Sequence, residues 1–247
     1  MKTINPLKIL LLLLAMTLLG GCATTANGGD PLVGINRVFY DINDSLDTHF
    51  IKPVAEGYEK VTPKPVRTGV SNFFENVGYI NVIFNDILQG KVNQGLADSG
   101  RFLINSTVGI GGLFDPATSM GLSRHNEDLG QSFGVWGAGE GAYLNLPLFG
   151  PSSLRDAPDL ATSTYLNPLF YVTSTITIPL GILNAVNKRA NLLEVTRVRD
   201  EAALDPYIFT REAYRQKRIF DIYDGNPPEP GLDESIDEDD KGVLTID

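Results

Sequence analysis

Three residues of one short stretch, His125, Glu127 and Asp128, are of the types that bind metals or transfer protons. A zinc site usually takes another nitrogen or sulfur ligand, but the chain has only one other histidine, His49, and one cysteine, Cys22. The stretch therefore favours a solvated loop, and we expect no bound metal. A serine hydrolase of the common type is also disfavoured, because the sequence has no G-x-S-x-G motif.

The single cysteine stands where a lipid could be attached. Residues 1–21 have a positively charged start, an apolar run and two final glycines, which is typical of a secretory signal peptide. The string Leu19-Gly20-Gly21-Cys22 resembles a bacterial lipobox, in which Cys22 receives a diacylglyceryl thioether and an amide-linked acyl chain. The alternative is an ordinary signal peptide followed by a chance cysteine. We expect a lipidated tether at residues 22–29.

Such an anchor would hold the protein at a membrane, because each buried acyl methylene contributes roughly 0.8 kcal/mol. Ala23 follows the cysteine where Asp could stand, which resembles the signal for export to the outer membrane. Apart from this covalent lipid, nothing in the sequence indicates a cofactor. A G-x-G-x-x-G fingerprint is absent.

The charge balance argues against one class of partner. The formal net charge is −10, opposite to that expected for a nucleic-acid-binding protein. Hydrophobic residues make up 43 % of the chain and charged residues 20 %, which is a globular composition. Nine acidic residues fall in 224–247, so we expect a domain at 30–223 followed by an acidic, disordered tail.

Apolar residues recur at helical spacing through most of this domain, which predicts a mainly α-helical fold. Prolines 53, 63 and 65 stand where helices would begin. The expected helices are a first at 31–48, a short one from Pro53, one from Pro63 to about 77, and others at 80–88, 92–107, 187–203 and 206–223.

One expected helix carries a row of uncharged amides. Asn81, Asn85 and Gln89 are spaced i, i+4 and i+8, so they share one face. A solvent-facing side and a polar lining explain this row equally well. The lining would suit a ligand with a polar head group.

Glycine is dense from 108 to 151, so backbone shape matters more there than side chains. Residues 133–136 and 143–146 predict a short β-hairpin, joined through Gly137, Gly139 and Gly141. From 161 to 187 no residue is charged, but Pro168, Pro179 and several Ser and Thr residues argue against a spanning helix. A kinked helix, buried in protein or lying in a membrane interface, fits this segment better.

Many spaced motifs resemble the MlaA (VacJ) family of outer-membrane lipoproteins. The similarity runs through residues 30–223, in the same order along the chain. It rests on Asp30-Pro31-Leu32, Pro53-Val54-Ala55, Asn72-Phe73, Leu88-Gln89-Gly90, Arg101-Phe102, Gly109 with Gly111-Gly112, Arg155-Asp156, Asp205-Pro206-Tyr207 and Arg211-Glu212-Ala213-Tyr214.

The resemblance implies a ring of amphipathic helices that lies in the inner leaflet of the outer membrane, on its periplasmic side, beside trimeric porins. A central channel would remove phospholipids misplaced in the outer leaflet and pass them to the periplasmic carrier MlaC, without covalent chemistry. It also implies that residues of the first helix, here Asp41, Ile42 and Asn43, affect channel closure. The loop glycines Gly137, Gly139 and Gly141 would affect gating.

We therefore expect a non-enzymatic phospholipid channel that maintains lipid asymmetry. The alternative is a lipoprotein that only scaffolds the envelope; a lipid-cleaving enzyme lacks its nucleophile. If the loop is a gate, Gly137→Pro or Gly139→Pro should stiffen it and abolish transfer without unfolding the protein.

Overall fold

The computed structural model describes residues 30–228, and most of them are helical. In chain order the elements are α2 (Val33–Leu46), the π-helix η2 (Asp47–Ile51), α3 (Lys52–Val61), α4 (Lys64–Leu88), α5 (Val92–Thr107), α6 (Pro116–Ser119), α7 (Leu129–Val135), β1 (Tyr143–Leu146), β2 (Gly150–Ser153), α8 (Asp159–Tyr165), the 3₁₀-helix η3 (Pro168–Tyr171), α9 (Ser174–Ala202) and α10 (Pro206–Ile222). The expected signal peptide, Cys22 with its tether, and the acidic tail beyond 228 lie outside the described residues.

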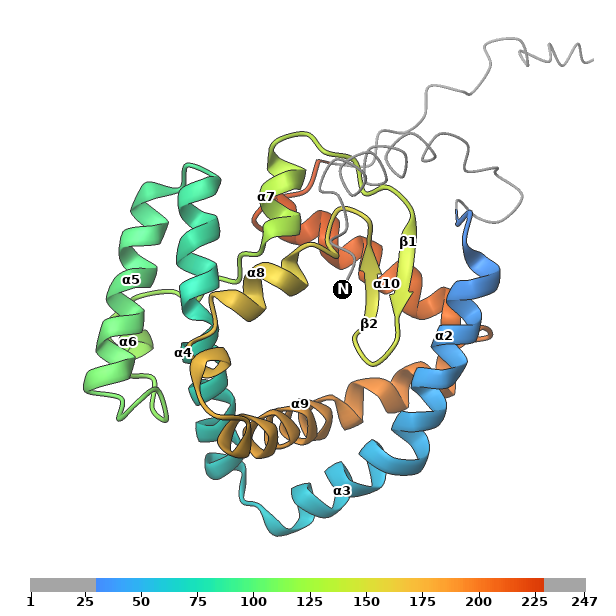
Figure 1. Ribbon diagram of the computed structural model, residues 1–247, viewed down its shortest axis with the longest axis horizontal. Helices are drawn as coiled ribbons and strands as arrows, with labels where there is room; N and C mark the ends of the chain where they lie inside the picture. The colour runs from blue at the N-terminus through green and yellow to red at the C-terminus, as the bar shows by residue number, and fades with distance from the viewer. Residues whose placement is uncertain (1–29, 229–247) are drawn as a thin grey trace, which may run out of the picture.

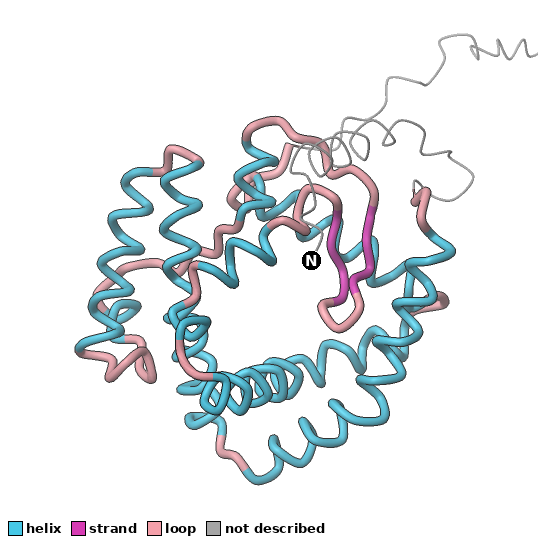
Figure 2. Tube along the Cα trace, viewed as in Figure 1, coloured by secondary structure: helices cyan, strands magenta, loops and turns pink. Residues whose placement is uncertain are grey.

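The helices are arranged as a ring, with α5 and α6 outside it beside α4 (Figure 1). The β1–β2 hairpin is the one sheet of the described chain, and its turn lies within the outline of the ring (Figure 2). The expectation of a mainly helical, ring-like fold with one hairpin is therefore confirmed.

Ion pairs join the first part of the ring to the last. The Arg37 guanidinium on α2 lies 2.6 Å from the Asp205 carboxylate, which caps α10 by accepting from the Ile208 N–H. A second ion pair joins the helices next to these, because Arg189 on α9 lies 2.7 Å from Asp47 at the start of η2. These contacts close a ring whose ends are more than 150 residues apart in sequence.

The interior of the ring wall is unusually polar. Among the described residues, seven hydrophobic side chains are buried, against nineteen polar or charged ones. On α2, Asn36 is buried while Ile35, Val38 and Ile42 are exposed. On α4, Asn85 and Asp86 are fully buried while Ile87 is exposed. The apolar stripes of these amphipathic helices are therefore exposed.

Helix boundaries differ from the sequence-based expectation at two places. The two helices expected at 63–77 and 80–88 are one continuous helix, α4, because neither a proline nor a cap separates them and Gly78 alone costs only about 1 kcal/mol. The first helix ends at Leu46, near the expected position, but runs through η2 directly into α3. Pro53 lies in the first turn of α3, as expected.

The expected strand at 133–136 is wrong. These residues belong to α7 or end it, because the Asp128 carboxylate caps that helix and accepts from the Gln131 N–H at 2.8 Å. The observed hairpin pairs β1 with β2, from Tyr143 opposite Ser153 to Leu146 opposite Gly150. The three loop glycines therefore join a helix to a strand.

The uncharged segment forms α8, η3 and the start of α9. Pro168 opens η3, whereas Pro179 lies inside α9 without ending it. The helix expected at 187–203 is thus the second half of a helix that begins at Ser174. Within residues 30–228, none of the helices combines the length and the apolarity needed to cross a bilayer.

Candidate functional site

A polar cavity of about 680 Å³ lies between α4, the segment that precedes α7, α8 and α9. Amide and hydroxyl side chains from all four segments line it. They are Ser71, Asn81, Asn126, Ser163, Asn167, Asn184, Asn187 and Asn191. Lys188 adds an exposed ammonium group. The lining offers many uncharged donors and acceptors together with a cation, which suits a polar, phosphate-bearing group.

The carboxylates at this cavity are engaged with the protein itself. The buried Glu127 carboxylate lies 2.9 Å from the Lys91 ammonium. The Asp159 carboxylate accepts from the Asn81 amide at 3.2 Å and from the Leu129 N–H at 3.0 Å. These bonds hold the wall in place.

Asp128 is held in the same way. Burial opposes its ionisation, but two hydrogen bonds from Arg218 lower the pKa of the Asp128 carboxyl below its usual value. The Arg218 guanidinium also contacts Asp156, and these two carboxylates raise its own pKa against the effect of burial. The cluster ties α7 and the β2–α8 turn to α10.

The three amides expected on α4 have different surroundings. Asn81 is among the residues that line the cavity. Asn85 is fully buried; its amide donates to the Asn81 carbonyl and its Oδ1 accepts from the Ser132 hydroxyl. The Gln89 amide donates to Glu127 at 2.8 Å. Asn85 and Gln89 thus bind neighbouring elements of the wall, and a lining role for Asn81 stays a prediction.

Sequence reasoning missed the α9 side of this cavity. Asn184, Asn187 and Asn191 are spaced i, i+3 and i+7, the helical period that singled out the amides of α4. Asn187 is buried and joins three helices, since it donates to Ser71 at 2.8 Å and accepts from the Tyr58 hydroxyl at 3.0 Å. The spacing of these asparagines was visible in the sequence, but the apolar residues around them favoured the interpretation of a membrane-interface segment.

A second cavity, of about 880 Å³, lies between α3, the first half of α4 and α9. Four residues line both cavities, so the two adjoin: they are Ser71, Glu75, Arg124 and Asn191. Its wall mixes cations such as Lys52 and Arg197 with anions such as Glu56 and Glu194. Polar surface therefore continues from the first cavity to the outside of α9.

His125 and Glu127, which were considered as metal ligands, are each paired with a different residue of the protein. The His125 Nδ1 lies 2.9 Å from the buried Asp98 carboxylate, while Glu127 pairs with Lys91. The expectation of a solvated loop is wrong for Glu127, which is buried. Within residues 30–228, no group of three or more His, Cys, Asp or Glu side chains is placed to hold a metal ion.

Asp86 is a second buried carboxyl next to Asp98. Burial, and then the Asp98 carboxylate, raise the pKa of Asp86 to about 7. Its Oδ1 accepts from the Gln94 amide at 2.8 Å, while its Oδ2 has no hydrogen-bond partner among the described residues. The α4–α5 pair thus contains an acid that titrates near neutral pH.

The β1–β2 hairpin is attached to α2 by two asparagines, seven residues apart. The buried Asn36 amide donates to the Tyr143 carbonyl at 2.8 Å, and its Oδ1 accepts from the Asn145 N–H at 2.9 Å. At the turn, Asn43 donates to the Leu146 carbonyl at 2.9 Å and accepts from the Leu148 N–H at 2.8 Å. Side-chain amides of α2 thus bond the backbone of β1 and of the hairpin turn.

The residues that the resemblance implied for channel closure lie on this helix. Asn43 holds the hairpin turn, as described above. Asp41 lines a cleft of about 330 Å³ between α2 and the α9–α10 junction, and Ile42 is exposed. The structure therefore connects Asn43 directly to the hairpin, and a closing role for the three residues stays a prediction.

The loop glycines precede β1 and are unequal. Gly137 has φ +88° and its N–H donates to the Gly134 carbonyl, so proline fits neither requirement there. Gly141 has φ +70°, and a Cβ at this position would lie 3.0 Å from Leu154 Cβ. An added Cβ at Gly139 meets nothing within 4 Å. An added Cβ at Gly137 is equally unobstructed, but Gly139 is the one of the three glycines without a positive φ, so a substitution there changes stiffness with the least strain.

Comparisons with known proteins agree with this architecture. The family model described as MlaA lipoprotein matches residues 28–221. The intermembrane phospholipid transport system lipoprotein MlaA of Shigella flexneri is 35 % identical over 227 residues, covering 87 % of this chain and 88 % of its own. The protein of the same name from Escherichia coli (strain K12) is 34 % identical over 223 residues, with the same coverage.

A solved structure described as "Structural basis for maintenance of bacterial outer membrane lipid asymmetry" superposes with a TM-score of 0.69. It is 32 % identical in sequence and covers 80 % of this chain and 99 % of its own. The helical ring, the polar cavity and the matched sequence extend over the same residues. The chain therefore belongs to the MlaA lipoprotein family.

Proposed function

We propose that this protein is an outer-membrane lipoprotein that conducts phospholipids from the outer leaflet to a periplasmic carrier and so maintains lipid asymmetry. One observation carries the proposal: exposed apolar side chains cover a helical wall that encloses a polar cavity. Such a ring can replace lipid within one leaflet, while its cavity gives a head group a polar path.

The same distribution supports the position that we propose in the membrane. Apolar residues on α2, α3, α4 and α9 are exposed, and acyl chains are the solvent that suits them. We place the ring in the inner leaflet, anchored on the periplasmic side through acylated Cys22, beside trimeric porins. Mass spectrometry of the mature N-terminus tests the anchor, since an unmodified Cys22 would contradict it.

The transport step needs no covalent chemistry. Amides on α4 and α9 can replace the water around a head group, and the Lys188 ammonium can attract its phosphate. The family relationship supports a transport role. MlaC is the carrier that we expect to receive the lipid.

A reconstituted assay tests the proposal. The acylated protein is placed in vesicles with a labelled phospholipid, and transfer to the soluble carrier is measured. We expect transfer that depends on the protein and leaves the phospholipid intact. Absence of transfer under conditions where the carrier binds lipid would contradict the channel.

The alternative is a scaffold whose apolar surface only binds other envelope proteins. Mass spectrometry of lipids that co-purify with the detergent-extracted protein distinguishes the two functions. A channel should retain phospholipid in stoichiometric amounts, and a scaffold should not.

A further inference from the structure

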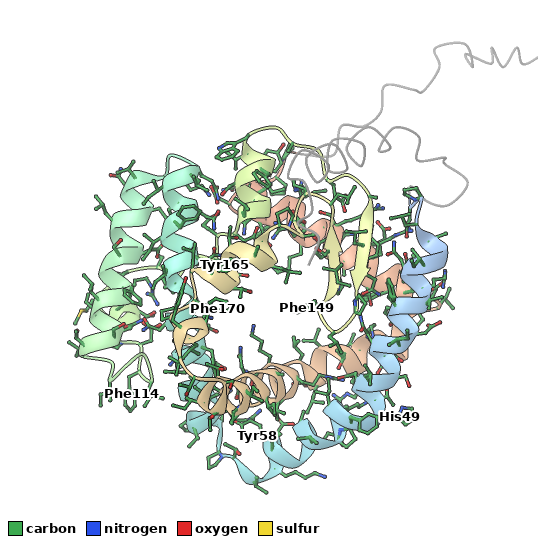
Figure 3. The ribbon with its side chains drawn as sticks, in the orientation of Figure 1. His49, Tyr58, Phe114, Phe149, Tyr165 and Phe170 are labelled. Atoms are coloured by element: carbon green, nitrogen blue, oxygen red, sulfur yellow. The ribbon has the colours of Figure 1, made fainter. Side chains whose placement is uncertain are left out.

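Two apolar side chains at the turn of the β1–β2 hairpin are exposed at the border of the ring opening. Leu148 is 78 % exposed and Phe149 is 70 % exposed. The turn lies within the outline of the ring, and the labelled Phe149 lies toward its centre (Figure 3). Burial against other protein residues does not explain these side chains.

The fold holds this turn in a strained conformation. Leu148 has φ +68°, a left-handed backbone that costs free energy in a residue with a γ-branched side chain. Asn43 fixes the turn by bonding the Leu148 N–H and the Leu146 carbonyl. Because Asn43 of α2 holds the strained backbone of Leu148, the position of this turn is fixed by the fold.

Aromatic side chains lie on the opposite border of the opening. Tyr165 and Phe170 pack edge to face with ring centroids 5.2 Å apart, and Phe170 and Tyr171 do so at 5.3 Å. The Tyr171 hydroxyl donates to the Tyr165 carbonyl at 2.8 Å, which fixes the cluster. All three residues are exposed, and Figure 3 places Tyr165 and Phe170 across the opening from Phe149.

These apolar groups adjoin the polar cavity. Phe149 lines a small hollow of about 180 Å³ together with Asp128 and Asp159, and both of these acids also line the 680 Å³ cavity. On the other border, the α8–η3 segment that carries the aromatic cluster gives Ser163 and Asn167 to the polar wall. The opening therefore presents polar and apolar surface side by side.

We propose that Leu148, Phe149, Tyr165, Phe170 and Tyr171, together the apolar rim, bind the acyl chains of a glycerophospholipid whose head group occupies the polar cavity. The inference rests on the proposed transport function and assigns a separate site to each half of the cargo. Moving acyl chains from water onto apolar and aromatic surface lowers the free energy. Placing them on the apolar rim also leaves no amide of the cavity without a hydrogen-bond partner.

Transfer rates of three variants of the full acylated protein test the site. Phe149→Ser removes the aromatic contact, Phe149→Leu keeps an apolar one, and Phe114→Ser is the matched control. Phe114 is 61 % exposed and lies on the outer side of the ring, away from the opening (Figure 3). We expect Phe149→Ser to slow transfer of a long-chain phospholipid about tenfold, which corresponds to about 1.4 kcal/mol. Phe114→Ser should stay within about twofold of the parent protein, a change of less than about 0.5 kcal/mol, whereas Phe149→Leu should slow transfer less than Phe149→Ser does.

The same variants distinguish a failure of the proposed acyl-chain site from a failure of the proposed transport function. If the parent protein transfers lipid and Phe149→Ser transfers it equally fast, the acyl-chain site is refuted while the channel stands. If the parent protein transfers none, the proposed function has failed first. A soluble phospholipid with two short chains should pass the parent protein and Phe149→Ser at similar rates, because it needs little apolar contact; a tenfold loss with this lipid as well would overturn the assignment.

Photo-crosslinking gives an independent measurement. A benzophenone amino acid at position 149 of the acylated protein, irradiated in phospholipid membranes, should form adducts on the acyl chains. Fragment spectra locate the adduct within the lipid. Adducts on the head group, or on another protein alone, would contradict the proposed site.

Discussion

Replacing Asn36 by alanine should detach the hairpin from α2 at a cost that the structure allows to be estimated. The variant leaves the Tyr143 carbonyl and the Asn145 N–H without their partner in a buried place. Each unsatisfied buried group costs about 1–3 kcal/mol, so we expect a loss of about 2–6 kcal/mol for the two groups. For a domain of this size that lowers Tm by roughly 4–24 °C. Circular dichroism of the detergent-solubilised protein on heating measures it.

Two further variants make this result specific. Asn43→Ala removes two bonds at a more exposed turn, and we expect a smaller loss of about 1–2 kcal/mol. Asn93→Ala, on the exposed side of α5, is the control and should leave Tm within about 2 °C. If Asn36→Ala melts with the control, the bonds to β1 contribute little, and the account of α2 as the support of the hairpin is refuted.

Three other changes test separate parts of the structure. Burial raises the folded-state pKa of the Asp86 carboxyl to about 7, so the stability that it contributes is full below pH 4 and is lost as the pH rises through 7. Asp86→Asn should therefore raise Tm more at pH 8 than at pH 5. An equal shift of Tm at both pH values would contradict the raised pKa. Arg218→Leu leaves the Asp128 carboxylate without its cation and removes one of the two guanidinium groups that contact Asp156, which keeps Arg155. We expect a loss of about 3–5 kcal/mol in the free energy of unfolding, and a change under about 1 kcal/mol would rule out this role. Gly139→Pro should abolish phospholipid transfer at an unchanged Tm, and normal outer-leaflet composition in cells carrying it would count against a gating loop.

The helical pattern of the sequence was sufficient for most of the fold. Apolar spacing located α5 and α10, and Pro53 located the start of α3, because these signals act within a few residues. The hairpin partner of β1 could not be found in this way. Strand β2 contains Pro151 and two serines, and so lacks the β-branched and aromatic residues of a recognisable strand, while its partner β1 is held by Asn36 of α2.

The candidate site was predictable to a similar degree. The spacing of Asn81, Asn85 and Gln89 identified a polar face of α4, but spacing cannot tell which amides line a cavity and which bind a neighbour. That distinction depends on contacts with Ser132 and Glu127, which lie about 40 residues away. The apolar rim gave no sequence signal, since its aromatics resemble ordinary core residues until the ring leaves them uncovered.

The reversed distribution of polar and apolar side chains has a consequence for how such a chain is made. A wall held by buried ion pairs and amides gains little from expelling water, so collapse in aqueous solution does not favour this arrangement over others. An amphiphile that covers the exposed apolar side chains should therefore favour the native ring. In aqueous solution the exposed apolar side chains of this chain therefore need a cover, such as detergent, before the ring is stable.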